Sequence, residues 1–361
     1  MPVPIPVLLM ARELNLGGSE RQLAEIAKAL DRTRFDPRVG CFRANGLRSE
    51  ELLSAGVPVV HFPVPSAASI HGALRIVAYI REQGIRLVHT FDTPANVYGV
   101  PAARMAGAPV VLSSQRAHRS LASPLNRHAL RLTDRLVDAV VVNCEFVQRH
   151  LIDDEKVPAS LIRLCYNGID TSAFHPARGT RPETLVIGTV SALRPEKGLE
   201  TLLDAFAQLR DAPCGLKLVI VGSGPCLKEL EVRAQALGIL PDCVFQPATP
   251  HVAQWLEAID IFVLPSLSEA LSNSLMEAMA CGCAVVATRV GGNPELVVHG
   301  ETGILVEAGD APGLARLVRE LAGAPDLRAE LANNAARFIR QRFSLEASAK
   351  RMGEIYCERL A

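Results

Sequence analysis

Two glutamates in the stretch Ala258–Thr288 have the residue type and spacing for shared chemistry. A short apolar run, Ile261–Leu264, is followed by a polar loop, an Ala/Met-rich segment and a second apolar run, Ala284–Ala287. This order predicts a strand, a loop, a helix and a second strand. Glu269 falls in the predicted loop and Glu277 in the predicted helix.

The spacing of these glutamates limits where they can meet. On one continuous helix, eight steps of about 100° would leave the carboxylates roughly 80° apart, off a common face. If Glu269 lies in the loop and Glu277 in the first turns, both can face the carboxyl edge of the sheet, where open α/β sheets bind ligands. The helix N-terminus there suits a phosphate group. A purely local alternative is a capping box formed by Ser274 and Glu277.

Two cations follow the strand predicted at Leu185–Val190. Arg194 and Lys197 lie three positions apart in a loop that ends at Gly198. Cations at the carboxyl edge of a sheet can neutralise a diphosphate. A solvated turn is the alternative interpretation of the same residues.

Glycines mark the other strand-to-helix junctions, where they let a ligand approach the backbone. Local alternatives are a cap at Ser19 for the first helix and a cap at Asn293 for a later one. Leu227 replaces the third glycine of a dinucleotide-binding fingerprint, so that motif fails. Together with the cations and carboxylates, the glycines predict a nucleotide-diphosphate site that also holds a polyhydroxyl group, because carboxylates accept hydrogen bonds from sugar hydroxyls. The glycine junctions are Gly17-Gly18, Gly222-x-Gly224 and Gly291-Gly292.

The composition indicates two α/β domains. The chain has 361 residues, of which 49% are apolar and 4% aromatic, and its 38 basic residues balance its 38 acidic ones. This length exceeds that of a single core, and the dominance of Val, Leu, Ile and Ala is typical of parallel sheets covered by helices. The charge balance argues against nucleic acid as the principal partner.

Short β-branched runs alternate with helical patterns along the chain, which predicts two doubly wound parallel sheets. A stretch rich in Gly, Pro and Thr, 167–183, has the composition of a linker. The predicted domains are 1–172 and 173–343, and 344–361 contains a final amphipathic helix, Leu345–Leu360. The predicted strands are Val7–Met10, Val39–Phe42, Val59–Phe62, Leu87–Thr90, Val110–Leu112, Ala139–Asn143, Ile162–Tyr166, Leu185–Val190, Lys217–Gly222, Ile261–Leu264, Ala284–Ala287 and Ile304–Val306.

Cysteine usage and the N-terminal residues indicate the compartment. The nine cysteines are scattered, and Cys281-x-Cys283 has no His or second pair at metal-binding spacing. Their apolar neighbours predict free thiols in a reducing compartment. The start, MPVPIPVLLM, lacks the basic region of a signal peptide, and no run approaches the ~18 apolar residues of a membrane span. We expect a cytoplasmic protein that at most contacts the inner face of the cell membrane.

Taken together, these motifs resemble the retaining, GT-B-fold glycosyltransferases of family 4 (GT4). The resemblance covers nearly the whole chain and is densest from Val186 to Val306. Its motifs are GTVSALRPEKG, VGSGP, SEALSNSLMEAMACG, CAVVATRVGGNPE and GETGILV, with LGGSE and YNGID earlier in the chain. It implies two Rossmann-like domains with an interdomain cleft, the first binding the acceptor and the second the donor. The final helix would cross back to the first domain.

The resemblance also implies roles for residues of the donor site. Arg194 and Lys197 would bind the donor diphosphate. Glu269 would contact the transferred sugar, and Glu277 the nucleotide ribose. Backbone groups would also approach the donor, and the residues that carry them are Gly17, Gly18, Gly222, Gly224, Asn273, Ser274 and Leu275.

The chain departs from the family near the transferred sugar. Many members have a His after the fourth or fifth strand of the first domain, where this chain reads VVLSSQRAHRS. The aligned residue is Arg116, with His118 two positions further on, and both are candidates for the approach to the anomeric carbon. His89 lies near the end of the preceding strand, and a purely structural role is the alternative interpretation of this residue.

The implied activity is transfer of a hexose or N-acetylhexosamine from a nucleotide-diphosphate sugar, expected to be a UDP-sugar. The acceptor would be a glycan or lipid-linked molecule of envelope or exopolysaccharide biosynthesis. Arg194 and Lys197 would stabilise the leaving diphosphate, and the absence of a D-x-D motif predicts no metal and no further cofactor. Two alternatives share the scaffold: a nucleotide-sugar epimerase or hydrolase, and a non-catalytic sugar-nucleotide-binding protein.

The expected acceptor domain contains a basic amphipathic segment, residues 115–138. Its leucines recur at helical spacing, and its acidic residues are few. Such a segment can rest on an anionic membrane surface, and an ordinary surface helix is the alternative. The arginines of the segment are Arg116, Arg119, Arg127, Arg131 and Arg135.

Overall fold

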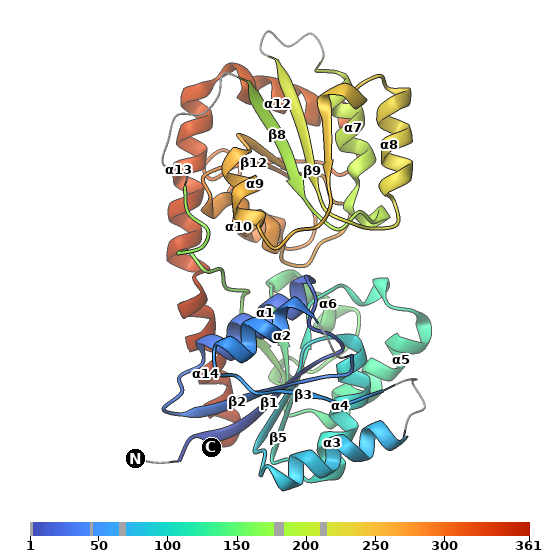
Figure 1. Cartoon of the computed structure of the whole chain (residues 1–361), viewed down its shortest axis with the longest axis vertical. Coiled ribbons are helices and arrows are strands. Elements are labelled where there is room, and N and C mark those ends of the chain that lie inside the picture. The colour runs from blue at the N-terminus through green and yellow to red at the C-terminus, as the bar shows by residue number, and fades with distance from the viewer. Residues whose placement is uncertain (1–2, 44–45, 65–69, 177–183, 210–214) are drawn as a thin grey trace. The chain divides into compact units, whose positions relative to one another are not determined.

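The computed structural model of the chain describes residues 3–43, 46–64, 70–176, 184–209 and 215–361 (Figure 1). It divides into two compact units: the first comprises Met1–Gly168 with Leu345–Ala361, and the second comprises Ile169–Ser344. The borders expected from the sequence, after residues 172 and 343, lie a few residues from these. Part of the expected linker, 177–183, lies outside the described residues.

A parallel sheet forms the centre of the first unit. Within the described residues its strand order is β3-β2-β1-β4-β5-β6-β7, and neighbouring strands pair in parallel. The order reverses between β1 and β4, and this topological switch point is where open α/β sheets bind ligands. The strands are β1 (Ile5–Ala11), β2 (Phe35–Cys41), β3 (Val59–His61), β4 (Leu87–Thr90), β5 (Val110–Gln115), β6 (Ala139–Val142) and β7 (Ile162–Leu164).

Helices connect these strands and lie on both sides of the sheet (Figure 1), as parallel pairing requires. Local chemistry fixes their starts; for example, Asp92 caps α4 by accepting a hydrogen bond from the Ala95 amide at 2.8 Å. The helices of the first unit are α1 (Gly18–Ala29), α2 (Leu47–Ser54), α3 (Ile70–Glu82), α4 (Thr93–Ala106), α5 (Pro124–Thr133), α6 (Glu145–Asp153) and α14 (Leu345–Leu360).

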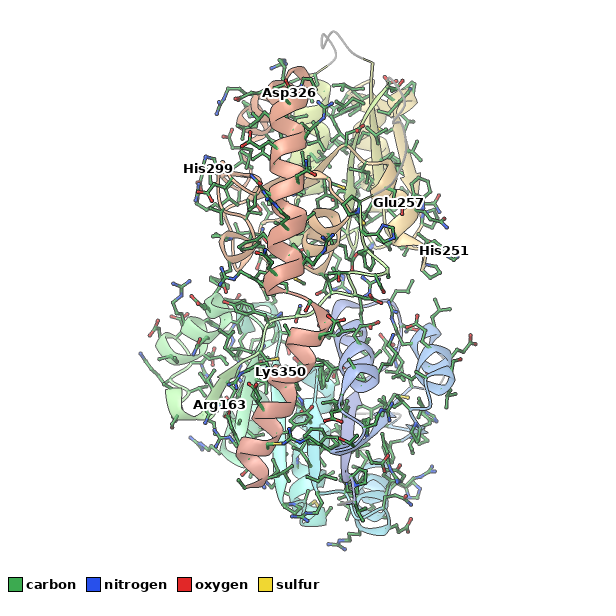
Figure 2. The ribbon with its side chains drawn as sticks, turned by 90° about the vertical axis from the view of Figure 1, so that its left-hand side faces the viewer. Arg163, His251, Glu257, His299, Asp326 and Lys350 are labelled. Atoms are coloured by element: carbon green, nitrogen blue, oxygen red, sulfur yellow. The ribbon has the colours of Figure 1, made fainter. Side chains whose placement is uncertain are left out.

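Helix α14 belongs to the first unit although it ends the chain. It has the bounds expected from its amphipathic pattern. Figure 2 shows Arg163 of β7 near this helix, and the Arg163 guanidinium pairs with Glu358 at 3.4 Å. Its buried face joins the core formed around β1, β2 and β4 through Ala349, Met352, Ile355 and Tyr356.

His89 anchors this helix from inside the sheet. Its Nδ1 lies 2.8 Å from the Tyr356 hydroxyl, and its Nε2 lies 2.9 Å from the Ser114 hydroxyl. Burial, and then the nearby Arg116 guanidinium, hold the pKa of His89 well below its usual value, so the ring is neutral. The interpretation of His89 as a structural residue is confirmed.

The second unit repeats the same architecture. In the described residues its strand order is β10-β9-β8-β11-β12-β13, again with parallel pairing. The expectation of two doubly wound parallel sheets is confirmed. The edge strand β10 was not expected from the sequence, because its side chains are only partly buried and lack a clear pattern. The strands are β8 (Leu185–Val190), β9 (Leu216–Val221), β10 (Cys243–Gln246), β11 (Ile261–Leu264), β12 (Ala284–Thr288) and β13 (Ile304–Val306).

The helices of the second unit separate its strands as those of the first unit do. Their apolar faces cover a second core, which is built around β8, β9, β11 and β12. The helices are α7 (Leu199–Ala207), α8 (Leu227–Ala236), α9 (Val252–Ala258), α10 (Asn273–Ala280), α11 (Asn293–Leu296), α12 (Ala311–Gly323) and α13 (Pro325–Arg342).

The start of α10 corrects one sequence interpretation. Ser272 is the N-cap, and its hydroxyl accepts a hydrogen bond from the Leu275 amide at 3.3 Å. The capping box of Ser274 and Glu277 is therefore wrong, because a cap at Ser272 puts Glu277 beyond the third helical position. Two other caps are also shifted: Gly17 precedes α1 in place of Ser19, and Gly292 precedes α11 in place of Asn293.

The basic segment 115–138 is not one helix. Gln115 ends β5, and α5 covers only Pro124–Thr133, between short 3-10 turns at Arg119–Leu121 and Asp134–Leu136. Pro124 accounts for the break, because its fixed φ and missing N–H suit the first turn of a new helix. Among the described helices, none combines the length and apolar character needed to cross a bilayer.

Candidate active site

The switch point of the second unit brings a lysine and a glutamate together. The strand order reverses between β8 and β11, and the loops after these strands carry Lys197 and Glu269. Lys197 Nζ donates to Glu269 Oε1 at 2.7 Å, and the Ser266 hydroxyl donates to the same oxygen at 2.8 Å. The carboxylate is nearly buried and the lysine is about one-fifth exposed, since their side chains are 9% and 22% accessible.

Backbone contacts between the two loops fix this pair. The Leu267 amide donates to the Glu196 carbonyl at 2.9 Å. Gly198 has a φ of 60°, and a Cβ there would lie 2.3 Å from the Pro265 carbonyl oxygen. Glycine at 198 is therefore required by both the left-handed backbone and the close approach of the loops. The loop backbones thus position the Lys197 ammonium group against Glu269.

The glycine loop after β9 supports the loop that carries Arg194. A Cβ on Gly222 would lie 1.8 Å from the Ser191 carbonyl oxygen, and the Leu193 amide donates to the Ser223 carbonyl at 3.1 Å. Gly224 approaches the same loop. Loop packing is therefore a sufficient reason for glycine at these positions, and donor contact by Gly222 and Gly224 stays a prediction.

Arg194 is the exposed cation of this region. Its side chain is 63% accessible, and its Nη1 is 3.9 Å from Glu196 Oε1. A pair so long and exposed contributes little energy. The guanidinium can therefore turn toward an anionic ligand at small cost.

Helix α10 contributes the remaining predicted donor residues. Glu277 is 2% exposed and lies one turn beyond the start of the helix. Asn273 and Ser274 form its first two positions, next to the loop that holds Glu269. The Leu275 amide already donates to the Ser272 cap. In the first unit, Gly17 and Gly18 open α1 after β1, at that unit's own switch point.

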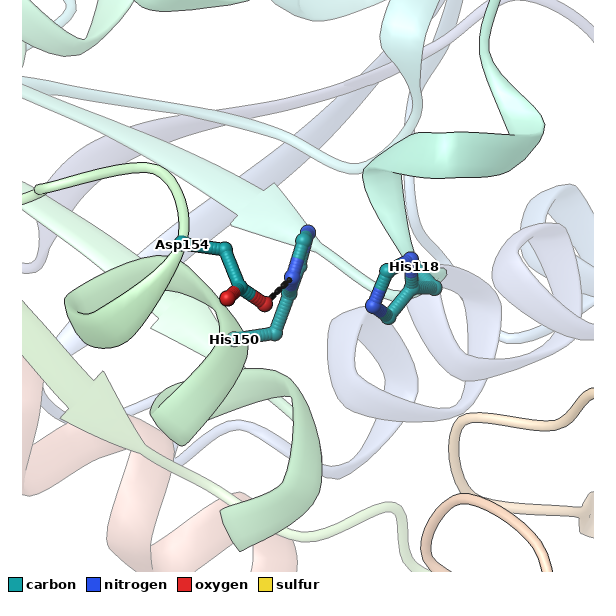
Figure 3. Close-up of side chains that lie close together, drawn as sticks. All are labelled: His118, His150 and Asp154. Carbon is teal, nitrogen blue, oxygen red and sulfur yellow. Dashed lines mark hydrogen bonds and ion pairs between the residues drawn. The ribbon is translucent and has the colours of Figure 1, made fainter.

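His118 is fixed by neighbours within the first unit (Figure 3). Its Nδ1 accepts from the Ser120 amide at 3.2 Å, and its ring stacks on His150 with centroids 3.5 Å apart. His150 Nδ1 lies 2.7 Å from Asp154 Oδ2, and its Nε2 accepts from the Arg119 amide at 3.3 Å. Burial and the neighbouring His150 lower the pKa of His118, which favours its neutral form.

The same three side chains have the spacing of a metal site. The candidate ligand atoms of His118, His150 and Asp154 lie within 4.8 Å of one another. A metal needs ring nitrogens whose lone pairs converge on it. Here the rings are stacked, and one nitrogen of each ring accepts a backbone N–H. The arrangement fits a structural cluster that orients His118 better than it fits a metal centre.

Arg116, the other first-unit candidate, has partners that sequence reasoning missed. Its Nη1 donates to Asn167 Oδ1 at 2.6 Å, and its guanidinium carbon is 4.8 Å from the centre of the Phe91 ring. Phe91 and Asn167 follow β4 and β7, so both could have been suspected as residues at strand ends. Their contact with Arg116 had no sequence signal.

Arg119 has a structural role that the basic-segment interpretation did not foresee. Its guanidinium is almost fully buried and donates to both oxygens of Asp134, at 2.7 and 2.8 Å. Glu155 lies 3.8 Å from the same group and also pairs with Arg131 at 2.7 Å. Arg119 is therefore not part of a solvated basic face.

Two doubly wound parallel sheets in one chain, here with a cation–carboxylate pair at the switch point of the second, are typical of the GT-B class of protein. The model of Glycosyltransferase Family 4 matches residues 16–173, and that of Glycosyl transferases group 1 matches residues 170–338. The GDP-mannose-dependent alpha-(1-6)-phosphatidylinositol monomannoside mannosyltransferase of Mycobacterium tuberculosis is 31% identical over 74% of this chain and 75% of its own length. The chain belongs to glycosyltransferase family 4.

Two further comparisons agree with this assignment. The lipopolysaccharide core biosynthesis mannosyltransferase LpcC of Rhizobium leguminosarum bv. viciae is 29% identical over 62% of this chain, and the match spans 65% of LpcC, just under two thirds of its length. The crystal structure of Anabaena Alr3699/HepE in complex with UDP-glucose superposes with a TM-score of 0.87 at 26% identity, covering 98% of this chain and all of HepE.

Proposed function

We propose that the chain is a retaining glycosyltransferase that moves a hexose or N-acetylhexosamine from a nucleoside-diphosphate sugar to a glycan or lipid-linked acceptor. The observation that carries this proposal is the Lys197–Glu269 pair, 2.7 Å apart, at the β8/β11 switch point. A cation beside a carboxylate at this edge offers one group to a diphosphate and one to sugar hydroxyls. Membership of the family supports the same activity.

The proposed donor is a UDP-sugar. HepE, which matches nearly the whole chain, was crystallised with UDP-glucose. The mycobacterial relative is named as GDP-mannose-dependent, so GDP-mannose is the rival donor. Arg194, Lys197 and Glu277 would serve either donor, because a diphosphate and a ribose are common to both.

The proposed mechanism follows from the charges that develop when the glycosidic bond of the donor breaks. Negative charge grows on the diphosphate, where Arg194 and Lys197 would stabilise it. Positive charge grows at the anomeric carbon, near which Glu269 would hold a sugar hydroxyl. The acceptor hydroxyl attacks from the side that the diphosphate leaves and gives its proton to the departing phosphate oxygen, which retains the configuration without an enzyme nucleophile. Side-chain cations then perform the charge stabilisation for which other transferases use a metal.

The proposed acceptor is part of the cell envelope or an exopolysaccharide, and we propose that the first unit contacts an anionic membrane surface to reach it. Support comes from four exposed leucines, here named the leucine surface: Leu121, Leu125, Leu132 and Leu136 are 39% to 77% exposed. Arg135 is exposed beside them. Apolar side chains next to a cation suit the boundary of an anionic bilayer.

The test is a donor and acceptor screen with the purified chain. UDP-glucose, UDP-N-acetylglucosamine, UDP-galactose and GDP-mannose are each incubated with alkyl glycosides, with and without EDTA, and the anomeric configuration of the product is read by NMR. We expect transfer with retention from a UDP-sugar at a rate that EDTA leaves unchanged. Donor breakdown that needs no acceptor would instead support the hydrolase or epimerase alternative, and an inverted product would contradict the mechanism.

A further inference from the structure

Arg116 lies where the first unit would bind a ligand. It follows β5 directly, at the carboxyl edge of the sheet. Its guanidinium covers Phe91, which follows β4, and β4 is one of the two strands at the switch point. In doubly wound folds the carboxyl edge of the sheet at the switch point is the usual ligand site.

Most of the hydrogen-bonding capacity of Arg116 is unused within the described chain. One hydrogen bond, from Nη1 to Asn167 Oδ1, is formed. The Nε atom is buried and has no acceptor among the described residues. A guanidinium carries five N–H donors in a fixed fork that matches the paired oxygens of a phosphate or carboxylate.

The groups that surround Arg116 are neutral. Burial lowers the pKa of His89, and burial raises the pKa values of the Cys165 thiol and the Tyr356 phenol. None of the three therefore carries a negative charge at neutral pH. Burial in these surroundings also lowers the pKa of Arg116 to about 10, so the side chain is still a cation. Its contact with the Phe91 ring offsets part of the unfavourable burial.

Arg119 lies in the same loop as Arg116 and provides a comparison, because its role is structural. It is paired with both oxygens of Asp134 and approaches Glu155, so its buried charge is compensated. Arg116, three residues earlier, has no carboxylate within ion-pair distance in the described part of the chain. Arg116 is partly buried, and a cation largely withdrawn from water without a counter-charge is unfavourable unless a ligand supplies one.

We propose that Arg116 binds an anionic group, a phosphate or a carboxylate, that one of the substrates carries to the first unit. This inference rests on the proposed function and deepens it, because it states a charge that a substrate must have. Three substrate groups carry such an anion: a phosphate on the acceptor, the diphosphate of the donor, and the carboxylate of a uronic acid as the transferred sugar.

The test observes Arg116 directly. The arginine Nε–H resonances of the ¹⁵N-labelled chain are recorded by NMR, and that of Arg116 is assigned by its absence in Arg116→Lys. The chain is then titrated with inorganic phosphate against potassium chloride at equal ionic strength, and separately with UDP, UDP-glucose and UDP-glucuronate. The phosphate titration is repeated in Lys197→Ala, to separate any response of the second unit, and with UDP bound.

We expect a saturable shift of the Arg116 resonance with phosphate and none with chloride. A shift that persists with UDP bound assigns the anion to the acceptor, a shift with UDP alone assigns it to the donor diphosphate, and a shift with UDP-glucuronate but not UDP-glucose assigns it to a uronate. A resonance that none of these anions moves would overturn the proposal and leave Arg116 as a clamp on Asn167. Failure to bind both UDP and GDP would instead refute the proposed function, while the phosphate titration would still decide the role of Arg116.

Thermal unfolding gives a second measurement that does not depend on the resonance assignment. Phosphate should raise the melting temperature of the wild type above that in chloride, because a ligand of the folded state stabilises it. Arg116→Met keeps the stem over Phe91 and should lose most of this rise, and Arg116→Lys should keep part of it. An equal rise in all three proteins would contradict the proposal.

Discussion

Lys197 and Glu269 are each other's partners in this structure, and a donor would place its diphosphate beside the same ammonium group. The pair is held by the backbones of two loops and by the Ser266 hydroxyl. Because the carboxylate is already oriented, little side-chain rearrangement is needed when a sugar arrives. Substitution of either residue should therefore affect turnover more than folding.

Lys197→Ala and Glu269→Ala should each lower turnover by about 10²-fold or more, because in the proposed mechanism Lys197 stabilises the leaving diphosphate and Glu269 holds a hydroxyl of the transferred sugar. Steady-state kinetics with the preferred donor measures this loss. Lys217→Ala is the matched control, since Lys217 pairs with Asp242 at 2.7 Å on the exposed surface of the same unit. A Lys197→Ala enzyme as fast as Lys217→Ala would remove Lys197 from the mechanism.

How far single residues could be predicted depends on whether their signal is local. Arg194, Lys197, Glu269 and Glu277 occur in short stretches with recognisable spacing, so they could be selected before any contact was known. The contacts of Arg116 join segments far apart in the chain, and no periodicity encodes them. The caps of α1, α10 and α11 were each misplaced by one or two residues, because neighbouring residues there have similar capping ability.

At the scale of elements, α14 shows how a helix is held in place by an apolar face together with buried polar contacts. Its apolar face fills the first core, and Tyr356 reaches His89 within the sheet. The helix could be predicted to the residue because its amphipathic pattern is uninterrupted. The segment 115–138 could not, because Pro124 divides a pattern that otherwise looks continuous.

Tyr356→Phe should destabilise the first unit by about 1–3 kcal/mol, because it leaves the buried, neutral His89 without its Nδ1 partner. Hydrogen exchange of β4 and α14, followed by mass spectrometry, reports this unit separately from the second. Met352→Leu is the control, since it changes a buried residue of the same helix while conserving volume. Unchanged protection in Tyr356→Phe would show that the contact contributes nothing.

The leucine surface should bind vesicles that contain anionic lipid. We expect co-sedimentation with phosphatidylglycerol vesicles, weaker binding at high salt and to phosphatidylcholine alone, and loss of binding in Leu125→Glu/Leu132→Glu, because glutamates remove apolar contact and oppose the lipid charge. Val232→Glu, at an exposed position on α8 of the second unit, is the control. Equal sedimentation of the leucine variant and the control would refute this contact.

At the scale of the whole molecule, one chain builds two cores and crosses between them twice. The crossings lie at 168/169 and 344/345, and the Ile169 amide donates to the Phe343 carbonyl at 2.9 Å. The end of the chain is therefore part of the core of the first unit. The division could be predicted from length, composition and the alternation of strands and helices, since each doubly wound sheet needs its own covering helices.

The central claim is that the second unit binds a nucleoside diphosphate through Lys197. Isothermal titration calorimetry of UDP and GDP into the wild type, Lys197→Ala and Lys217→Ala tests it most directly. We predict one site per wild-type chain, the same affinity in Lys217→Ala, and a loss of about tenfold or more in Lys197→Ala, the size of one charge-assisted hydrogen bond. Absence of binding by both nucleotides, or equal affinity in all three proteins, would contradict the account.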